Sequence, residues 1–281
     1  MKIAYFPNQT ALKSELVWRA FLEGMKLCGY EPSENDYDAD TVVIWSVLWS
    51  GRMLANQKIR EHYLSQGKPV FIIEVGALNR GVTWKVAVNN ITAAGLYANK
   101  SELDLDRAKK LGIELAPNII KRSQAILLAG QHQSSLQWQG QPALNQWVRD
   151  KISEIRKFTD RPIVVRPHPR CHIEKIFENG IVTESPIKLP NTYDRFDIDF
   201  KYHCIINHNS GPGIQSAISG CPIIVDQTSL AYPVSTTIEQ IETPNLPDRH
   251  QWFIEILHTE WTIEEIAHGI PQKRLLRELT F

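Results

Sequence analysis

Residues 204–226 read CIINHNSGPGIQSAISGCPIIVD, and this stretch decides the fold. An apolar run stops at Asn207, a polar turn follows, and a second apolar run ends at Asp226. We expect both runs to be buried strands and residues 213–219 to form a short helix between them. A strand, a turn and a helix in this order are typical of a parallel sheet built from βαβ units.

The polar turn has the features of an anion-binding site. Free backbone N–H groups at a helix start, together with the helix dipole, favour a negative charge. Such turns lie beyond the carboxyl ends of parallel strands, where ligands bind. An ordinary strand-to-helix connection that uses Asn, Ser and Gly for turn geometry is the alternative interpretation. The residues predicted to bind the ligand at this turn are His208, Asn209, Ser210, Gly211, Gly213 and Asp226.

Residues 161–170, RPIVVRPHPR, form a second apolar run that ends in a stiff tip. Two prolines flank His168 and restrict the backbone around it. Arg166, His168 and Arg170 are therefore held at the end of a strand with little entropy left to lose, which suits a phosphate. A proline-stiffened loop with solvated arginines is the alternative.

The same alternation of apolar runs and helical segments extends along the chain and predicts an α/β fold. Further strands are expected at 2–6, 41–45, 69–75, 84–89, 125–129, 162–166, 180–183 and 203–207, and the last one at 222–226. Further helices are expected at 12–27, 51–66, 143–158, 249–257 and 262–268. Thr262 and Glu265 have the spacing of a capping box at the start of the last helix. We predict two Rossmann-like domains facing a cleft, residues 1–120 and 121–281, with the last helix able to cross back.

Composition excludes several classes of protein. With 281 residues, 43% of them hydrophobic and 22% charged, the chain is neither disordered, collagen-like nor a coiled coil. Its formal charge of zero argues against binding nucleic acid or membrane through an overall field. Residues 121–170 nevertheless hold nine basic and three acidic side chains, which makes a local basic zone.

The cysteine pattern and the hydropathy predict a cytoplasmic protein, in the host cytoplasm if a phage encodes it. The four cysteines are dispersed and show no zinc-ligand spacing. No run approaches the ~18 apolar residues of a membrane span. We therefore expect no membrane span, no metal site and no disulfide framework.

Two of these motifs, taken together, resemble the motifs of a known protein family. His168-Pro169, followed about 40 residues later by His208-Asn209-Ser210, resembles the HP and HSS-type motifs of bacterial capsule-polysaccharide transferases, including polysialyl- and Kdo-transferases. Teichoic-acid glycerophosphotransferases are similar in this region. Residues 216–226 and 251–269 also resemble the carboxyl half of that group. The resemblance covers roughly residues 125–270.

The resemblance implies the GT-B architecture, with a nucleotide-sugar bound mainly by the second domain. In that family the HP histidine and the HSS-type serine contact the donor phosphate, which implies this role for His168 and Ser210. Asn209 stands where the family has its first serine.

We therefore predict a metal-independent glycosyltransferase that uses a UDP- or CMP-sugar as co-substrate and no cofactor. Without a metal, fixed donors and cations must stabilise the leaving phosphate. Arg166 and His168 are predicted to be catalytic, and Arg170 and Gln131 to bind the donor with the turn residues. Glu74 ends an apolar strand in the first half and is the predicted base. Pairing with Arg80 or Arg52 is its alternative role.

The predicted acceptor site lies on strand ends of the first half: Trp49, Arg52, Arg80 and Lys85. A role in the core is the alternative for the tryptophan. The whole chain also looks like phage-encoded DNA-modifying glycosyltransferases, which implies double-stranded DNA as a partner and 5-hydroxymethylcytosine as the acceptor. A transferase for a capsule, lipopolysaccharide or teichoic glycan is the second hypothesis. A non-catalytic nucleotide-binding module is the third.

Overall fold

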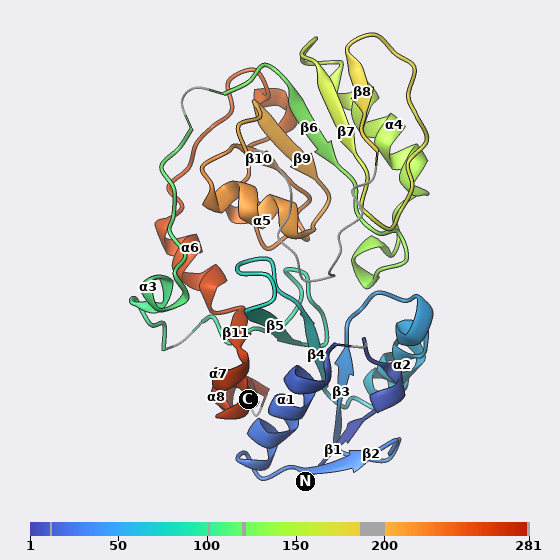
Figure 1. The fold of residues 1–281 in the computed structure, drawn as a ribbon, viewed down its shortest axis with the longest axis vertical. Helices are drawn as coiled ribbons and strands as arrows, with labels where there is room; N and C mark the ends of the chain where they lie inside the picture. The colour runs from blue at the N-terminus through green and yellow to red at the C-terminus, as the bar shows by residue number, and fades with distance from the viewer. Residues whose placement is uncertain (12, 101, 120–121, 186–199, 280–281) are drawn as a thin grey trace. The chain divides into compact units, whose positions relative to one another are not determined.

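The computed structural model describes residues 1–281 except 12, 101, 120–121, 186–199 and 280–281 (Figure 1). Contacts divide the chain into two compact units. Unit 1 comprises Met1–Arg107, Ser134–Leu136 and Ile254–Phe281, and unit 2 comprises Ala108–Gln133 and Gln137–Phe253. The boundary predicted at residue 120 falls within the first segment of unit 2. The C-terminal segment belongs to unit 1.

Unit 1 is built on a six-stranded sheet with the order β11-β5-β4-β3-β1-β2. The strands are β1 (Lys2–Tyr5), β2 (Glu31–Glu34), β3 (Thr41–Trp45), β4 (Val70–Val75), β5 (Thr83–Val88) and β11 (Glu260–Thr262). The first four are parallel, whereas β5 is antiparallel to β4 and β11 is antiparallel to β5. From β1 the chain moves to β2 on one side and then continues through β3 and β4 on the other. The strand order therefore reverses between β1 and β3.

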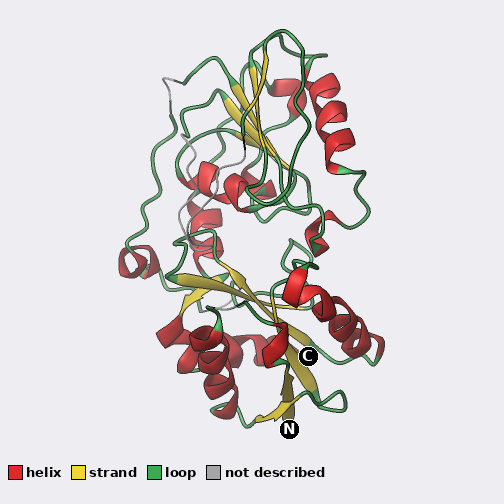
Figure 2. Ribbon diagram, turned by 45° about the vertical axis from the view of Figure 1, so that its right-hand side comes forward, coloured by secondary structure: helices red, strands yellow, loops and turns green. Residues whose placement is uncertain are grey.

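Helices lie on both sides of these strands (Figure 2). They are α1 (Glu15–Lys26), α2 (Ala55–Ser65), α7 (Ile263–Ala267) and α8 (Ile270–Leu279). In α1, Val17, Phe21 and Met25 recur every fourth residue and are buried, so they share one face. Phe21 packs against Phe71 of β4 with ring centroids 5.5 Å apart. The apolar face of α1 thus covers the middle of the sheet.

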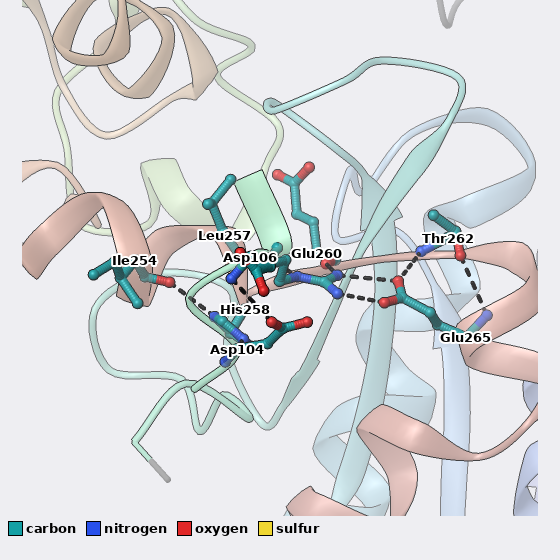
Figure 3. A network of polar contacts seen from close by, with 9 residues as sticks. Asp104, Asp106, Ile254, Leu257, His258, Glu260, Thr262 and Glu265 are labelled. Carbon is teal, nitrogen blue, oxygen red and sulfur yellow. Dashed lines mark hydrogen bonds and ion pairs between the residues drawn. The ribbon is translucent and has the colours of Figure 1, made fainter. Parts of the chain in front are cut away.

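A buried arginine ties the C-terminal segment to the rest of unit 1, and Figure 3 labels its partners Leu257, Glu260 and Glu265. Arg107 donates from Nε to the Leu257 carbonyl at 2.7 Å and from Nη2 to the Glu260 carbonyl at 2.6 Å. Its guanidinium also pairs with the carboxylate of Glu265. Glu265 and Thr262 form the predicted capping box at the start of α7. These contacts fix both ends of β11, which pairs with β5.

Unit 2 is built on a five-stranded sheet in which all strands are parallel, with the order β10-β9-β6-β7-β8. The strands are β6 (Ile126–Ala129), β7 (Ile163–Arg166), β8 (Ile181–Thr183), β9 (Cys204–Asn207) and β10 (Ile223–Ile224). The helices are α4 (Leu144–Ile155) and α5 (Gly211–Ile218), while α3 (Arg107–Leu111) and α6 (His250–Leu257) contain the borders between the units. The strand order reverses between β6 and β9, as in a half-Rossmann fold.

Both faces of the unit 2 sheet are buried, which explains the nearly continuous apolar runs in the sequence. Ile126 and Leu128 pack in one cluster with Trp147 of α4. Leu127 belongs to a second cluster with Ile205 on the neighbouring strand. Alternate residues of β6 therefore serve opposite faces.

The predicted strands and helices are confirmed, with ends shifted by up to four residues. Helix α5 begins at Gly211, earlier than predicted, so Pro212 lies in its first turn. The prediction missed β2, α3, β11 and α8. Within the part of the chain that the structure describes, no helix combines the length and apolar character that a membrane span needs.

Candidate functional site

The predicted donor residues of unit 2 meet at one edge of its sheet. Strands β9, β6 and β7 are parallel neighbours, and Ala129 lies opposite both Asn207 and Arg166. Three segments follow these ends: 130–133, 167–171 and 208–210. They leave the sheet on the same side, and two of them flank the point where the strand order reverses. Open α/β sheets bind their ligands there.

Two buried amides bridge the reversal point. Gln131 donates from Nε2 to Asn209 Oδ1 at 3.1 Å, and the Asn209 backbone N–H donates to Gln131 Oε1 at 3.2 Å. Both side chains are buried. We call these two residues the amide pair. The pair joins the loop after β6 to the loop after β9.

Asn209 is fully engaged by the protein. Its Nδ2 donates to Thr228 Oγ1 at 2.8 Å and to the Gln137 carbonyl at 3.2 Å. Gln137 Nε2 donates back to the Asn209 carbonyl at 3.0 Å. Thr228 in turn donates to Asp226, from its hydroxyl at 2.7 Å and from its N–H at 2.9 Å. Asn209 and Asp226 therefore position the loop in this structure, and their predicted contacts with the donor stay predictions.

Burial opposes ionisation of Asp226, but the two hydrogen bonds from Thr228 outweigh it and lower the pKa of this carboxyl group. The ionised carboxylate is directed to Thr228 rather than left unpaired at the edge. At this edge of the unit 2 sheet, the negative charge of Asp226 is therefore bonded to Thr228 and forms part of the network that fixes the loop.

Ser210 occupies the N-cap position of the short helix α5, next to the N–H donors at its start. Asn207 Nδ2 donates to the Ser210 hydroxyl at 2.8 Å and to its carbonyl at 3.1 Å. The Ser210 side chain accepts no N–H of the helix. Among the described residues, the N–H groups of Ser210 and Gly211 have no acceptor, and Pro212 has no N–H. Two N–H groups and the positive end of the helix dipole therefore remain for an anion.

Gly213 serves packing. A Cβ at this position would lie 2.8 Å from Asn207 Oδ1 and 3.0 Å from Val225 Cγ1, so only glycine fits. The Gly213 N–H donates to the Ser210 carbonyl at 3.2 Å, so the prediction that this N–H is free for an anion is wrong. The same is true of Asn209, whose N–H is taken by Gln131.

His208 lies against Trp138, with ring centroids 5.4 Å apart and planes at 81°. Burial lowers the pKa of His208, although Asp226 and a hydrogen bond with the Gln137 backbone act in the opposite direction. A neutral imidazole packed on an indole supports the wall of the site. Its predicted contact with the donor stays a prediction.

His168 forms a tight turn with the residues that follow it. The Arg170 N–H donates to His168 Nδ1 at 3.1 Å, and the Cys171 N–H donates to the His168 carbonyl at 3.0 Å. Because Nδ1 accepts, the proton of the neutral ring is on Nε2. The ring lies 5.4 Å from that of His132 at an angle of 80°. Burial, and then Arg170, lowers the pKa of His132.

Arg166 is only partly available to a ligand. Its side chain is 15% exposed, and its guanidinium lies 3.7 Å from the carboxylate of Glu184, which follows β8. Arg170 is exposed at the tip of the turn. Of the two arginines, Arg170 is the one whose charge faces solvent.

Glu74 in unit 1 is half-buried and accepts three hydrogen bonds. They come from the Ser46 hydroxyl at 2.7 Å, the Val47 N–H at 3.2 Å and its neighbour Val75 N–H at 2.9 Å. It lies opposite Lys85 in the ladder between β4 and β5. The structure gives Glu74 an anchoring role, and its predicted role as a base is not tested.

The predicted acceptor residues differ in their exposure. Trp49 and Lys85 are buried, at 8% and 6% exposed, and burial lowers the pKa of Lys85. Arg80 donates to the Gly76 carbonyl at 3.5 Å, and Arg52 is exposed in the turn after β3. Of these four residues, Arg52 presents the most surface to a ligand.

Sequence reasoning missed three residues that build the unit 2 site. His132 directly follows Gln131, so its place in the loop after β6 was a usable signal. Gln137 and Thr228 are far from Asn209 in sequence and show no pattern that could have linked them. The described residues contain no group of three His, Cys, Asp or Glu side chains that could hold a metal ion.

No protein-family model and no curated protein matches this chain. Solved structures with a similar fold include the following two. One is the KpsC β-Kdo 2,4-transferase of Thermosulfurimonas dismutans, with a TM-score of 0.55 and 12% identity over 91% of this chain and 89% of that one. The other is the β-Kdo 2,7-transferase of the same KpsC, with a TM-score of 0.50 and 14% identity over 98% of this chain and 100% of that one.

These likenesses concern the fold. Both structures are named as Kdo transferases, so they agree with the predicted resemblance to capsule transferases, and neither supports the predicted likeness to DNA-modifying enzymes. Together with the two largely parallel sheets, they confirm the α/β, GT-B fold class that the sequence predicts.

Proposed function

We propose that this chain is a glycosyltransferase that moves a sugar from a nucleotide-sugar to a hydroxyl group of a saccharide. One observation carries the proposal: at the reversal point of the unit 2 sheet, the amide pair fixes a loop whose next two N–H groups have no acceptor among the described residues. The fold shared with Kdo transferases supports it. The donor would bind with its phosphate at the start of α5.

The reaction needs a phosphate group to leave with its negative charge stabilised. The N–H groups of Ser210 and Gly211 would receive this charge, and the Ser210 hydroxyl would donate to it. His168 would donate from Nε2, because its Nδ1 is held by Arg170. Arg170 would add a positive charge from the tip of the turn. These groups are neutral donors or cations, so the transfer is proposed without a metal ion.

The acceptor hydroxyl would lose its proton to a carboxylate, for which Glu74 is the proposed base. We favour a saccharide acceptor over DNA because both structures are named as Kdo transferases and neither is named as a DNA-modifying enzyme. Activity on a duplex that contains 5-hydroxymethylcytosine would restore the DNA hypothesis.

A binding experiment tests the donor site. We expect UDP or CMP to bind the purified protein in isothermal titration calorimetry. Ser210→Ala should weaken binding by about tenfold, the effect of one lost hydrogen bond to a charged group. Ser219→Ala, at the other end of α5, is the matched control and should bind like the wild type. Failure of both nucleotides to bind, or unchanged binding by Ser210→Ala, would contradict the donor site.

Turnover separates an enzyme from a binding module. With a UDP- or CMP-sugar and no acceptor, an enzyme should release nucleotide slowly, and mass spectrometry should detect the free sugar. EDTA should leave this rate unchanged. Binding without any release or transfer would favour the non-catalytic module.

A further inference from the structure

Unit 1 contains a groove of about 710 Å³ that the donor site does not use. It runs between α1 and the edge strand β2 and reaches the turns after β1 and β3. Residues that carry chemistry in its lining are Tyr5, Glu15, Trp18, Arg19, Glu34 and Arg52. Because the strand order reverses between β1 and β3, one end of the groove lies where parallel sheets bind ligands.

An aromatic wall forms part of the groove. Tyr5 and Trp18 stack with ring centroids 5.5 Å apart and an angle of 23° between their planes. The Tyr5 hydroxyl donates to Glu34 at 3.2 Å, which fixes the tyrosine ring at the end of β1. Paired aromatic rings give a rigid apolar surface at low entropic cost. The C–H groups on one face of a pyranose ring pack well on such a surface.

Charged groups surround this wall in nearly balanced number. The lining contains four carboxylates and three cations, namely Glu15, Glu23, Glu31, Glu34, Arg19, Lys26 and Arg52. A nucleic-acid backbone or a strongly acidic glycan would meet more negative than positive charge here. Carboxylates and guanidinium groups instead suit the hydroxyls of a neutral sugar, since carboxylates accept and guanidinium groups donate hydrogen bonds.

A ligand can displace the ion pair nearest the aromatic wall. Arg19 Nη2 lies 2.6 Å from Glu15 Oε1, and the two side chains are 65% and 60% exposed. The Arg19 guanidinium also lies 5.6 Å from the centre of the Trp18 ring. Exposed ion pairs of this kind contribute little to stability. Ligand hydroxyls can therefore replace the contacts of Glu15 and Arg19 at small cost.

The sheet edge beside the groove is protected against pairing with another strand. Strand β2 is short and contains Pro32 between Glu31 and Glu34. Proline and charged side chains are the usual protection of an edge strand against pairing. The occupant is therefore a ligand that lies in the groove rather than a strand added to β2.

We propose that this groove binds a neutral saccharide chain, with one pyranose ring packed on Tyr5 and Trp18 and its hydroxyls bonded to Glu15 and Glu34. The inference rests on the proposed function and names the acceptor class for it. The groove holds the acceptor chain on unit 1, while unit 2 binds the donor.

Saturation-transfer NMR tests the groove with three neutral probes: maltohexaose, cellohexaose and N-acetylchitohexaose. We expect ring-proton signals from at least one of them with the wild type. Trp18→Ala should weaken that binding by about tenfold or more. Leu16→Ala is the matched control, because Leu16 is exposed on the same helix and does not line the groove. It should bind the probe like the wild type.

Glu34→Gln is a second variant that keeps the aromatic wall and changes an exposed side chain, so its folding is not in question. It should weaken binding of the same probe severalfold. The inference is overturned if no probe gives a signal at millimolar concentration, or if Trp18→Ala and Glu34→Gln both bind like the wild type. It is also overturned if a hydroxymethylated duplex displaces the bound saccharide from the groove.

The same samples separate this inference from the proposed function. Saccharide binding without any binding of UDP or CMP would leave the groove in place and reject the donor site. Nucleotide binding without any saccharide binding would reject the groove and leave the donor site in place. Trp18→Ala should bind nucleotide like the wild type.

Discussion

Two carboxylates fix loops at the strand ends of unit 1, whereas amides join the loops at the reversal point of the unit 2 sheet. In unit 1, Glu74 accepts from the loop after β3, and Glu260 accepts from the N–H groups of Ala77 and Leu78 at 2.6 and 3.0 Å; the buried amide of Asn56 also donates to the Trp45 carbonyl. In unit 2 the joining groups are the Gln131–Asn209 pair and the neighbouring Asn207, while the carboxylate of Asp226 accepts from Thr228.

The amides at the reversal point of unit 2 fit the proposed phosphate ligand. A carboxylate at the start of α5 would repel a phosphate, whereas an amide donates and accepts without net charge. Asp226 is consistent with this, since its hydrogen bonds are directed to Thr228. At the edge of unit 1 a ligand with hydroxyl groups meets no such conflict.

The largest effect should come from removing the buried anchor of unit 1. Glu260 is fully buried and also accepts from the Thr83 hydroxyl at 2.8 Å. Glu260→Ala removes an acceptor from three donors and removes one of the two carboxylates that act on buried Lys85. Loss of a buried charged partner costs about 3–5 kcal/mol. Urea unfolding should show this loss, and the exposed Glu264→Ala should unfold like the wild type. A loss below ~1 kcal/mol would show that the anchor is dispensable.

A carboxylate placed in the amide pair tests the comparison directly. Asn209→Asp keeps the shape of the side chain, but it loses the Nδ2 donor to Thr228 and brings a negative charge to the proposed phosphate site. We expect nucleotide affinity to fall by roughly 10- to 100-fold, since each such polar change is worth ~1–3 kcal/mol. Asn245→Asp makes the same charge change at an exposed position and is the control. Equal nucleotide binding by both variants would show that the charge of the anchor is irrelevant.

The sequence predicted the strands well because each one is a short run of apolar residues with clear turn signals at its ends. The runs at 162–166 and 203–207 became β7 and β9, and the predicted loops follow their carboxyl ends. Parallel pairing then brings these loops to one edge without further information. This is why the positions of His168 and Ser210 could be inferred from sequence alone.

The elements that were missed depend on contacts across the chain. Strand β11 has only three residues, too few for an alternating pattern to be recognised, and it pairs with β5 far earlier in the sequence. The anchoring role of Glu74 was equally invisible, because its donors Ser46 and Val47 come from another strand end. Local pattern reveals which residues lie at an edge, whereas their mutual hydrogen bonds are a property of the folded protein.

The smallest effect should be a loss of stability on mild acidification, centred on unit 2. Burial lowers the pKa of His132, His203 and His208 in unit 2, and of His258 in unit 1. A histidine with a lowered pKa stays neutral in the folded protein while the unfolded chain takes up a proton. Stability is therefore complete above about pH 6.5, the unfolded pKa of histidine, and falls as the pH drops toward the folded value.

Thermal unfolding between pH 7.5 and 5.5 should show this decline. His203, whose ring contacts the Ile241 carbonyl at 2.6 Å, is the histidine to replace because it lies outside the proposed donor site. His203→Gln should make the decline shallower, since the folded state then has one fewer histidine that resists protonation. The exposed His250→Gln should follow the wild-type curve. If His203→Gln also follows the wild-type curve, protonation of the His203 ring does not cause the loss of stability in acid. The two units would then differ in the groups that fix their strand ends and not in their response to acid.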